Sequence, residues 1–226
     1  MKMKRKKQNK KQKKAKKVKR QKQTKKQNRF SKPFNLVIVG YGGQGVLSLA
    51  KIIANAAFMH GYDVKQTEMH GLAQRFGALQ CHVRFGEKVY SPFVITADLI
   101  IALDLLEAAR ALNFASKNTI ILSESSAMAP DPMAQINTKI FVRELKKKAK
   151  IFIVDAAKIT GKLIGETTMS NIFMLGYALK KKFLPLKKEL VWKAITQKLR
   201  PEFLEKNKKV FEAAFKNKTK NSNFIL

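Results

Sequence analysis

Residues 35–50 read NLVIVGYGGQGVLSLA, and this stretch decides the expected fold. Residues 35–40 are a short β-branched run that ends in glycine, which is typical of a strand. A glycine-rich turn, 40–45, comes next, and residues 46–59 are apolar nearly all round, as in a helix buried against a sheet. Residues 63–69 (DVKQTEM) have roughly alternating polarity and predict a second strand. We therefore expect a right-handed strand–helix–strand unit with parallel strands.

The rest of the chain continues the alternation of strands and helices. Further buried strands are expected at residues 98–103, 119–122 and 150–154, a short helix at 105–112, and a loop containing Pro130 and Pro132 at 124–138. Asp155 is expected to cap the helix after it. Helices are expected at about 170–182, 187–199 and 202–215. The pattern predicts the α/β class, with an open, mostly parallel Rossmann-like sheet and C-terminal helices.

One segment has a different pattern. Residues 79–85 (LQCHVRF) alternate with period two, and Gly86-Glu87 reads as a turn before Val89-Tyr90. This predicts a hairpin, inserted antiparallel at the edge of the sheet.

Charge divides the chain into two parts. The chain has 226 residues, with 47 Lys and Arg against 15 Asp and Glu, a net charge of +32. Residues 1–33 hold 18 of the basic residues and no acid, so we expect a disordered basic tail before an α/β domain at 34–217. Three interpretations of the tail stay open: a solvated tail without a specific role, an arm that binds RNA, DNA or anionic lipid by counterion release, and a mistaken translation start.

Composition excludes several classes. A single cysteine, Cys81, excludes a disulfide framework, a structural Cys-rich zinc site and an iron–sulfur cluster held by this chain alone. The longest apolar region, 36–60, is interrupted by glycines and by Lys51, so no membrane span is expected. The start of the chain does not read as a secretory signal. We therefore expect a soluble, cytoplasmic protein.

The glycine turn could bind an anion. Glycines allow close backbone approach, and the helix that follows offers free N–H groups and a partial positive charge. The candidate ligand-binding residues are Gly40, Gly42, Gly43, Gln44 and Gly45. Glu68 follows Gly45 by 23 residues, near the position of the ribose-binding acid of dinucleotide sites. A free-standing oxidoreductase that binds NAD or FAD is thus one hypothesis, and a tight turn with a purely structural role is its alternative.

Two stretches together resemble a known family. Residues 35–50 and residues 67–78 (TEMHGLAQRFGA) are similar to the gamma-type subunit of 2-oxoacid:ferredoxin oxidoreductases, and most similar to the beta subunit of indolepyruvate ferredoxin oxidoreductases. The second match runs through Glu68, His70, Gly71, Gln74, Arg75 and Gly77. Tyr90-Ser91-Pro92 also fits the pattern. Phe76 stands where the family usually has glycine, which implies a changed loop path if that glycine has positive φ.

The resemblance implies a subunit of a hetero-oligomer. A larger catalytic subunit would carry thiamine diphosphate, magnesium and [4Fe-4S] clusters, and this chain alone would bind no cofactor and no metal. The complex would decarboxylate a 2-oxoacid of the aryl-pyruvate type oxidatively, with coenzyme A as co-substrate and ferredoxin as electron acceptor. Nucleic acid would bind only through the basic tail. A third hypothesis, an RNA- or membrane-associated protein with the α/β domain as scaffold, stays open.

Four polar residues follow the second strand within eight positions. Glu68, His70, Gln74 and Arg75 would lie on a loop beyond a strand end, where α/β proteins usually bind ligands. Arginine suits a carboxylate or phosphate, and histidine can transfer a proton near neutral pH. We expect this loop and the glycine turn to form one wall that contacts substrate or coenzyme A. In the alternative, Glu68 and Arg75 pair with each other or with a partner protein, and His70 is a structural donor.

Other conspicuous residues have ordinary interpretations. Cys81 is expected to be a small buried apolar residue, and His82 a surface or interface residue. Asp104 and Glu107 are expected to be acids at a helix start, and Trp192 part of the core.

Overall fold

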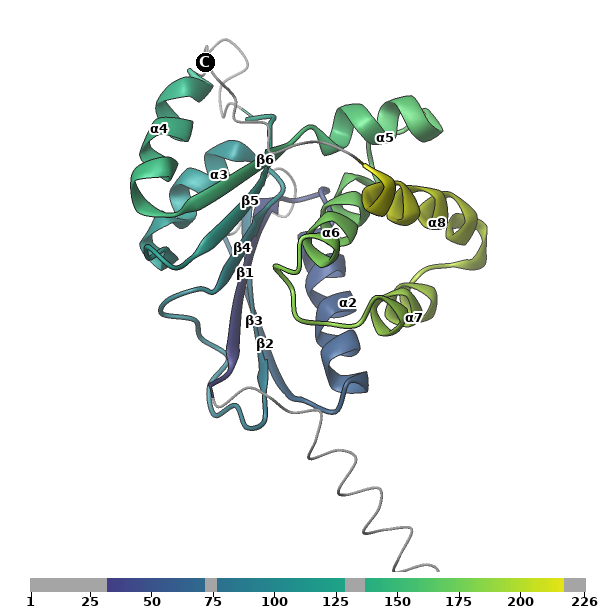
Figure 1. Ribbon diagram of the computed structural model, residues 1–226, viewed down its shortest axis with the longest axis horizontal. Coiled ribbons are helices and arrows are strands. Elements are labelled where there is room, and N and C mark those ends of the chain that lie inside the picture. The colour runs from purple at the N-terminus through teal and green to yellow at the C-terminus, as the bar shows by residue number, and fades with distance from the viewer. Residues whose placement is uncertain (1–31, 72–76, 129–136, 218–226) are drawn as a thin grey trace, which may run out of the picture.

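The computed structural model describes residues 32–71, 77–128 and 137–217. A six-stranded mixed sheet has helices on both faces (Figure 1). The strand order is β2-β3-β1-β4-β5-β6. The strands are β1 Phe34–Tyr41, β2 Asp63–His70, β3 Ala78–Gly86, β4 Leu99–Ala102, β5 Ile120–Glu124 and β6 Lys150–Val154.

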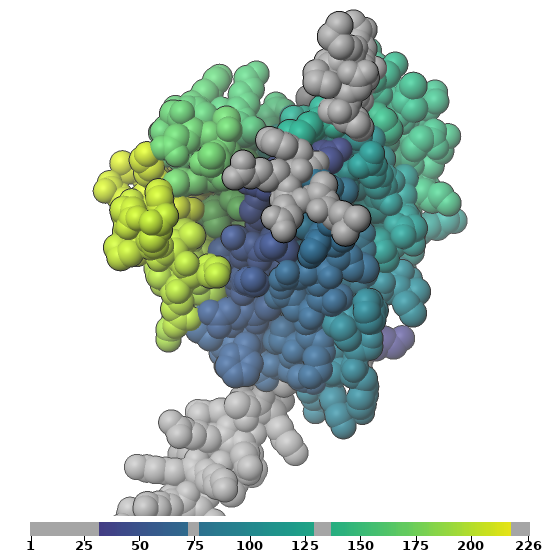
Figure 2. Space-filling view, turned by 180° about the vertical axis from the view of Figure 1, so that it is seen from behind, coloured from purple at the N-terminus to yellow at the C-terminus, as the bar shows by residue number. Residues whose placement is uncertain are grey.

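The helices form two layers. One layer contains α2 (Val46–Met59) together with the C-terminal helices α5 (Ala156–Ile164), α6 (Ser170–Lys180), α7 (Lys188–Lys198) and α8 (Pro201–Lys216). The other contains α3 (Leu105–Arg110), the 3-10 helix η1 (Ala111–Phe114) and α4 (Thr138–Lys148). In Figure 2 the blue α2–β3 part of the surface lies between the yellow-green C-terminal helices and the teal α3–α4 side. The predicted α/β class, with C-terminal helices, is confirmed.

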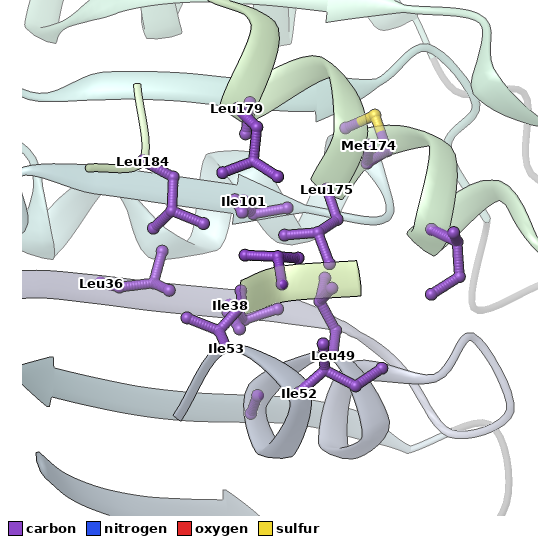
Figure 3. Packing of buried hydrophobic residues seen from close by; sticks show 14 of the residues in the cluster. Leu36, Ile38, Leu49, Ile52, Ile53, Ile101, Met174, Leu175, Leu179 and Leu184 are labelled. Carbon is purple, nitrogen blue, oxygen red and sulfur yellow. The ribbon is translucent and has the colours of Figure 1, made fainter. Parts of the chain in front are cut away.

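Alternation along β1 explains why both faces of the sheet are covered. Leu36 and Ile38 point to the α2 side, whereas Val37 and Val39 point to the α3–α4 side, and all four are buried. An inner strand buried on both faces must be apolar throughout, as this one is. Figure 3 shows the larger cluster, in which Leu36 and Ile38 meet side chains of α2, β4 and α6.

The sheet is parallel from β1 to β6 and antiparallel at its other edge. β1 pairs parallel with β4, β4 with β5, and β5 with β6. β3 pairs antiparallel with both β1 and β2. β1 and β2 therefore run in the same direction, as predicted for the strand–helix–strand unit, but β3 lies between them.

The predicted hairpin exists with a different partner. β3 forms its hairpin with β2 through residues 71–77, and Val89-Tyr90 belongs to no strand. The expected partner was wrong because the backbone after Gly86 bonds to side chains and does not pair with a strand. For example, the Val89 amide donates to Asp63 Oδ2 at 2.8 Å. β3 is an inner strand, and β2 forms the edge.

Two local expectations also need correction. Asp155 stands at the N-cap of α5, but its side chain accepts no capping bond; the carboxylate of Glu124, at the end of β5, accepts from the Ala157 amide at 3.0 Å instead. The helix α4 was not expected, because its apolar face is narrow, with only Val142 and Leu145 buried. Part of the predicted 124–138 loop and most of the basic tail lie outside the described residues. Within the part of the chain that is described, no helix is both long and apolar enough to cross a membrane.

Candidate functional site

The glycine turn is closed by its own side chain. Gln44 Oε1 accepts from the Tyr41 amide at 2.8 Å, and the Gln44 amide donates to the Tyr41 carbonyl at 3.1 Å. A Cβ at Gly40 would lie 2.6 Å from that same Oε1 atom. The Gln44 side chain thus stabilises the turn. Glycine is required at position 40 because the side-chain oxygen of Gln44 approaches the backbone there.

Gly43 and Gly45 both need a left-handed backbone, but their surroundings differ. Their φ angles are 101° and 83°. A Cβ at Gly45 would lie 2.2 Å from Nδ2 of the buried Asn171 on α6, whereas a Cβ at Gly43 would meet nothing within 4 Å. One side of the turn therefore packs against α6, and Gly43 is open to a ligand or to a partner.

The glycine turn and the hairpin loop lie side by side. Tyr41 is paired with Ala78 at the end of the β1–β3 ladder. Just beyond it, the Gly42 amide donates to the Gly77 carbonyl at 3.0 Å. The predicted adjacency of the two loops is confirmed for these residues, and it places them at the carboxyl edge of the parallel strands, where α/β proteins usually bind ligands.

The polar residues of the second motif begin at the same edge. His70 ends β2 and is exposed, with Nδ1 3.1 Å from the Gly71 carbonyl oxygen. Glu68 lies two residues earlier; its Oε1 is 3.8 Å from Lys51 Nζ on α2 and accepts from Gln66 Nε2 at 3.1 Å. Gln74 and Arg75 lie outside the described residues, so their roles stay predictions.

This geometry does not favour a dinucleotide site. In that motif the acid ends the strand next to the glycine turn. Here β3 separates β2 from β1, so Glu68 is about 10 Å away across two strand spacings. Glu68 also has a cation partner in Lys51. The structure thus gives the NAD or FAD hypothesis no support.

A buried polar cluster of Tyr41, Asp104 and Glu107 lies beside the glycine turn. The sequence did not indicate that these residues lie together. Asp104 is the N-cap of α3, accepting from the amides of Leu106 at 2.8 Å and Glu107 at 3.2 Å. Its other oxygen accepts from the Met128 amide at 2.7 Å. The Tyr41 hydroxyl donates to the Met128 carbonyl at 3.3 Å. These residues come from three separate segments. The one signal in the sequence is that each of them stands at or shortly after the end of an apolar strand.

The ionisation of this cluster follows from its burial. Burial and the nearby carboxylate of Glu107 raise the pKa of Tyr41 to about 12. Burial also raises the pKa of Asp104, although its three amide donors oppose this. Glu107 pairs with Arg110 at 2.5 Å. The helix-start positions predicted for Asp104 and Glu107 are confirmed, and the cluster braces the segment 125–128 against the glycine turn.

Cys81 and His82 on β3 are both buried, although only Cys81 was expected to be. Cys81 is fully buried, and burial raises the pKa of its thiol to about 12, as expected of a small core residue. His82 was expected at the surface or at an interface, which is wrong, because it is only 2% exposed in the isolated chain. Its Nδ1 accepts from the Val94 amide at 3.0 Å, and burial lowers its pKa. Trp192 packs on the core beside Phe211, as predicted.

Fold and edge together define a mixed-sheet α/β domain that presents two joined loops at the carboxyl edge of its parallel strands. Among residues 32–71, 77–128 and 137–217, no three His, Cys, Asp or Glu side chains are grouped to hold a metal ion. The chain belongs to the pyruvate ferredoxin/flavodoxin oxidoreductase family, which it matches over residues 35–217.

Known proteins resemble the chain over most of its length. It is 31% identical over 194 residues to the indolepyruvate oxidoreductase subunit IorB of Thermococcus kodakarensis, a match that covers 82% of this chain and 96% of the relative. The pyruvate oxidoreductase subunit PORC of Thermotoga maritima has a similar structure, with a TM-score of 0.63 and 21% identity, over 83% of this chain and 97% of that one.

A further structure embeds the same fold in a longer chain. The 2-oxoglutarate:ferredoxin oxidoreductase of Magnetococcus marinus, with 2-oxoglutarate, coenzyme A and succinyl-CoA bound, matches 83% of this chain and 32% of its own. The TM-score is 0.65 and the identity 17%. The fold thus occurs both as a separate subunit and as part of a larger polypeptide.

Proposed function

We propose that this chain is the smaller subunit of a ferredoxin-dependent 2-oxoacid oxidoreductase of the indolepyruvate type. The complex converts an aryl pyruvate and coenzyme A to an aryl acyl-CoA and carbon dioxide. Two electrons pass to ferredoxin and one proton is released. The observation that carries this proposal is the 31% identity to an indolepyruvate oxidoreductase subunit over nearly the whole of that relative.

The cofactors belong to the larger subunit in this proposal. Thiamine diphosphate with magnesium would supply the decarboxylation chemistry there, and [4Fe-4S] clusters would carry the electrons. The present chain has a single cysteine, Cys81, which is buried in the core, so it could not supply the thiolates of such a cluster. The complex would work in the cytoplasm, in keeping with that free thiol.

The smaller subunit would contribute a wall of the shared active-site cavity. The glycine turn and the hairpin loop are joined by the bond between Gly42 and Gly77. His70 is exposed at the same edge, and Gly43 leaves the turn accessible. In this arrangement the loop that carries Gln74 and Arg75 contacts the carboxylate of the 2-oxoacid or the phosphates of coenzyme A. Arginine is suited to either group.

Reconstitution with the larger subunit tests the proposal. The two chains are co-expressed anaerobically, and reduction of ferredoxin is measured with indolepyruvate and coenzyme A. We expect the pair to co-purify and to reduce ferredoxin only when both substrates are present. Failure to assemble, or activity of the smaller chain alone, would refute the proposed function.

Single substitutions test the shared wall. His70→Ala and Arg75→Ala should each lower kcat/KM by about 100- to 1,000-fold, as expected when one positioned polar group is lost from a site. The matched controls are Lys162→Ala and Arg143→Ala, on exposed positions of α5 and α4. Unchanged turnover and unchanged assembly in both loop variants would contradict the role of the loop, while leaving the assignment of the complex intact.

A further inference from the structure

The segment between β3 and β4, residues 87–98, displays large apolar side chains to solvent. Tyr90 is 83% exposed, Phe93 56% and Ile95 87%. We call these three residues the amino-edge patch. Their neighbours Val89, Val94 and Ala97 are buried, so the segment packs on the sheet with one set of side chains and presents the other. Large apolar side chains that are exposed close together, rather than scattered singly, are typical of interaction sites.

Three hydrogen bonds hold the segment against the sheet, although it is neither helix nor strand. Strand side chains fix its backbone: Asp63 accepts from the Val89 amide at 2.8 Å, Arg84 donates to the Ser91 carbonyl at 2.9 Å, and His82 accepts from the Val94 amide at 3.0 Å. These bonds hold the backbone in the conformation that exposes the three patch side chains. A surface that is ordered before binding loses less entropy when a partner docks.

The patch is separate from the candidate site. β3 runs antiparallel to β1, and Phe85 at its end is paired with Phe34 at the beginning of β1. The segment therefore starts at the amino edge of the sheet and reaches His82, about midway along β1, while the glycine turn follows the carboxyl end of that strand. The eight residues of β1 span about 26 Å. The glycine turn and the patch are thus separate surfaces of the domain.

Charge decides between the possible occupants. The chain has a net charge of +32, so two copies repel each other, and residues 1–33 carry no acid that could offset the charge of the domain. Both signs of charge border the patch: Lys88 Nζ lies 4.9 Å from the centre of the Tyr90 ring and Arg84 donates to the Ser91 carbonyl, while the neighbouring Glu87 is exposed. The carboxylates of Asp63 and Asp98, close to it, already accept backbone amides. The net charge of the whole chain, rather than the border of the patch, favours an occupant of opposite charge.

We propose that the amino-edge patch is a docking surface for the larger subunit of the complex, which meets it with an apolar hollow ringed by carboxylates. This inference rests on the proposed function. Tyrosine and large apolar side chains at the centre of an interface commonly dominate its affinity, and a charged rim raises the association rate. The smaller subunit is then held at two opposite edges of its sheet: by this patch, and at the wall of the active site.

Binding of purified larger subunit to the full-length chain tests the proposal. Tyr90→Ser/Ile95→Ser should weaken binding by about 30-fold or more, which corresponds to about 2 kcal/mol. Lys88→Glu should slow association by about tenfold at low salt, and the difference should shrink at high salt. The matched control is Leu163→Ser, which removes a partly exposed apolar side chain from α5 on the other face of the sheet. Because the substituted side chains of the patch are mostly exposed, thermal unfolding of the variants should match the wild type.

Each outcome has a distinct meaning. If the wild-type chain binds the larger subunit and the patch variant binds equally well, the docking proposal is wrong and the proposed function stands. If the wild-type chain does not bind at all, the proposed function itself fails. If light scattering shows that the isolated chain is a dimer and the patch variant a monomer, the occupant is a second copy, and our assignment is overturned.

Discussion

Replacing Gly45 by alanine should destabilise the fold more than replacing Gly43, although both have a left-handed backbone. Each substitution forces a Cβ into that region, at a cost of about 1–2 kcal/mol. Only at Gly45 would the new Cβ also meet another side chain, Asn171 Nδ2 at 2.2 Å. Crowding of this kind in a packed interior costs about 1–3 kcal/mol more. The expected losses are therefore about 2–5 kcal/mol for Gly45→Ala and about 1–2 kcal/mol for Gly43→Ala.

A double-mutant cycle separates the two causes. Asn171→Ala removes the clashing amide together with its bond to the Ile172 amide, so it is destabilising alone. In the Gly45→Ala background, Asn171→Ala also relieves the clash. The double variant should therefore be more stable than the sum of the two single losses predicts, by a coupling energy of about 1–3 kcal/mol. In the Gly43→Ala background the coupling should be close to zero.

Urea unfolding of the full-length chain measures these differences. The midpoint shift multiplied by the denaturant slope gives the change in free energy of unfolding. Equal losses for the two glycine variants, or no coupling between positions 45 and 171, would refute the contact between the turn and α6.

Three further predictions concern the core. Gly176→Ala should lower the free energy of unfolding in urea by about 1–3 kcal/mol, since its Cβ would lie 2.7 Å from that of Ala214. Ala214→Gly in the same chain should recover part of this loss. If the effects of the two substitutions simply add, the packing of α6 on α8 is contradicted. Burial lowers the pKa of His82 and of His60, so the unfolded chain binds these protons first and stability should fall as pH drops below about 6.5. His82→Gln should reduce this slope and leave the part that His60 contributes, and an unchanged slope would contradict the role of His82. Cys81, with its pKa raised to about 12, should resist a thiol reagent at pH 8 until the chain unfolds, and fast labelling of the native chain would contradict its burial.

The sequence predicted the parts of the fold that are set by local patterns. The pattern of residues 35–59 predicted β1 and α2 correctly. A strand buried on both faces is a short, continuous apolar run, whereas a buried helix is a longer one. The position of β3 was not predictable in this way. Alternation shows that a strand has two unlike faces, but it does not identify the two strands beside it. His82 was misplaced for a related reason, since its cover comes from the 87–98 segment farther along the chain.

The candidate site was predictable where two motifs meet. The adjacency of the glycine turn and the hairpin loop followed from the expectation that both lie at strand ends, and the bond between Gly42 and Gly77 bears it out. The buried cluster of Tyr41, Asp104 and Glu107 was not predicted as a unit. Its members are brought together by the order of the strands, which no local pattern encodes.

The hydrogen bond between Gly42 and Gly77 has a mechanical consequence. It links the hairpin loop to the turn from which α2 begins, and Gly45 in that turn touches α6. A displacement of the loop when another polypeptide binds would therefore act on the start of α2 and on α6, which packs against α8. Amide hydrogen exchange in α6, whose residues 171–179 are buried within the domain, should then change on assembly.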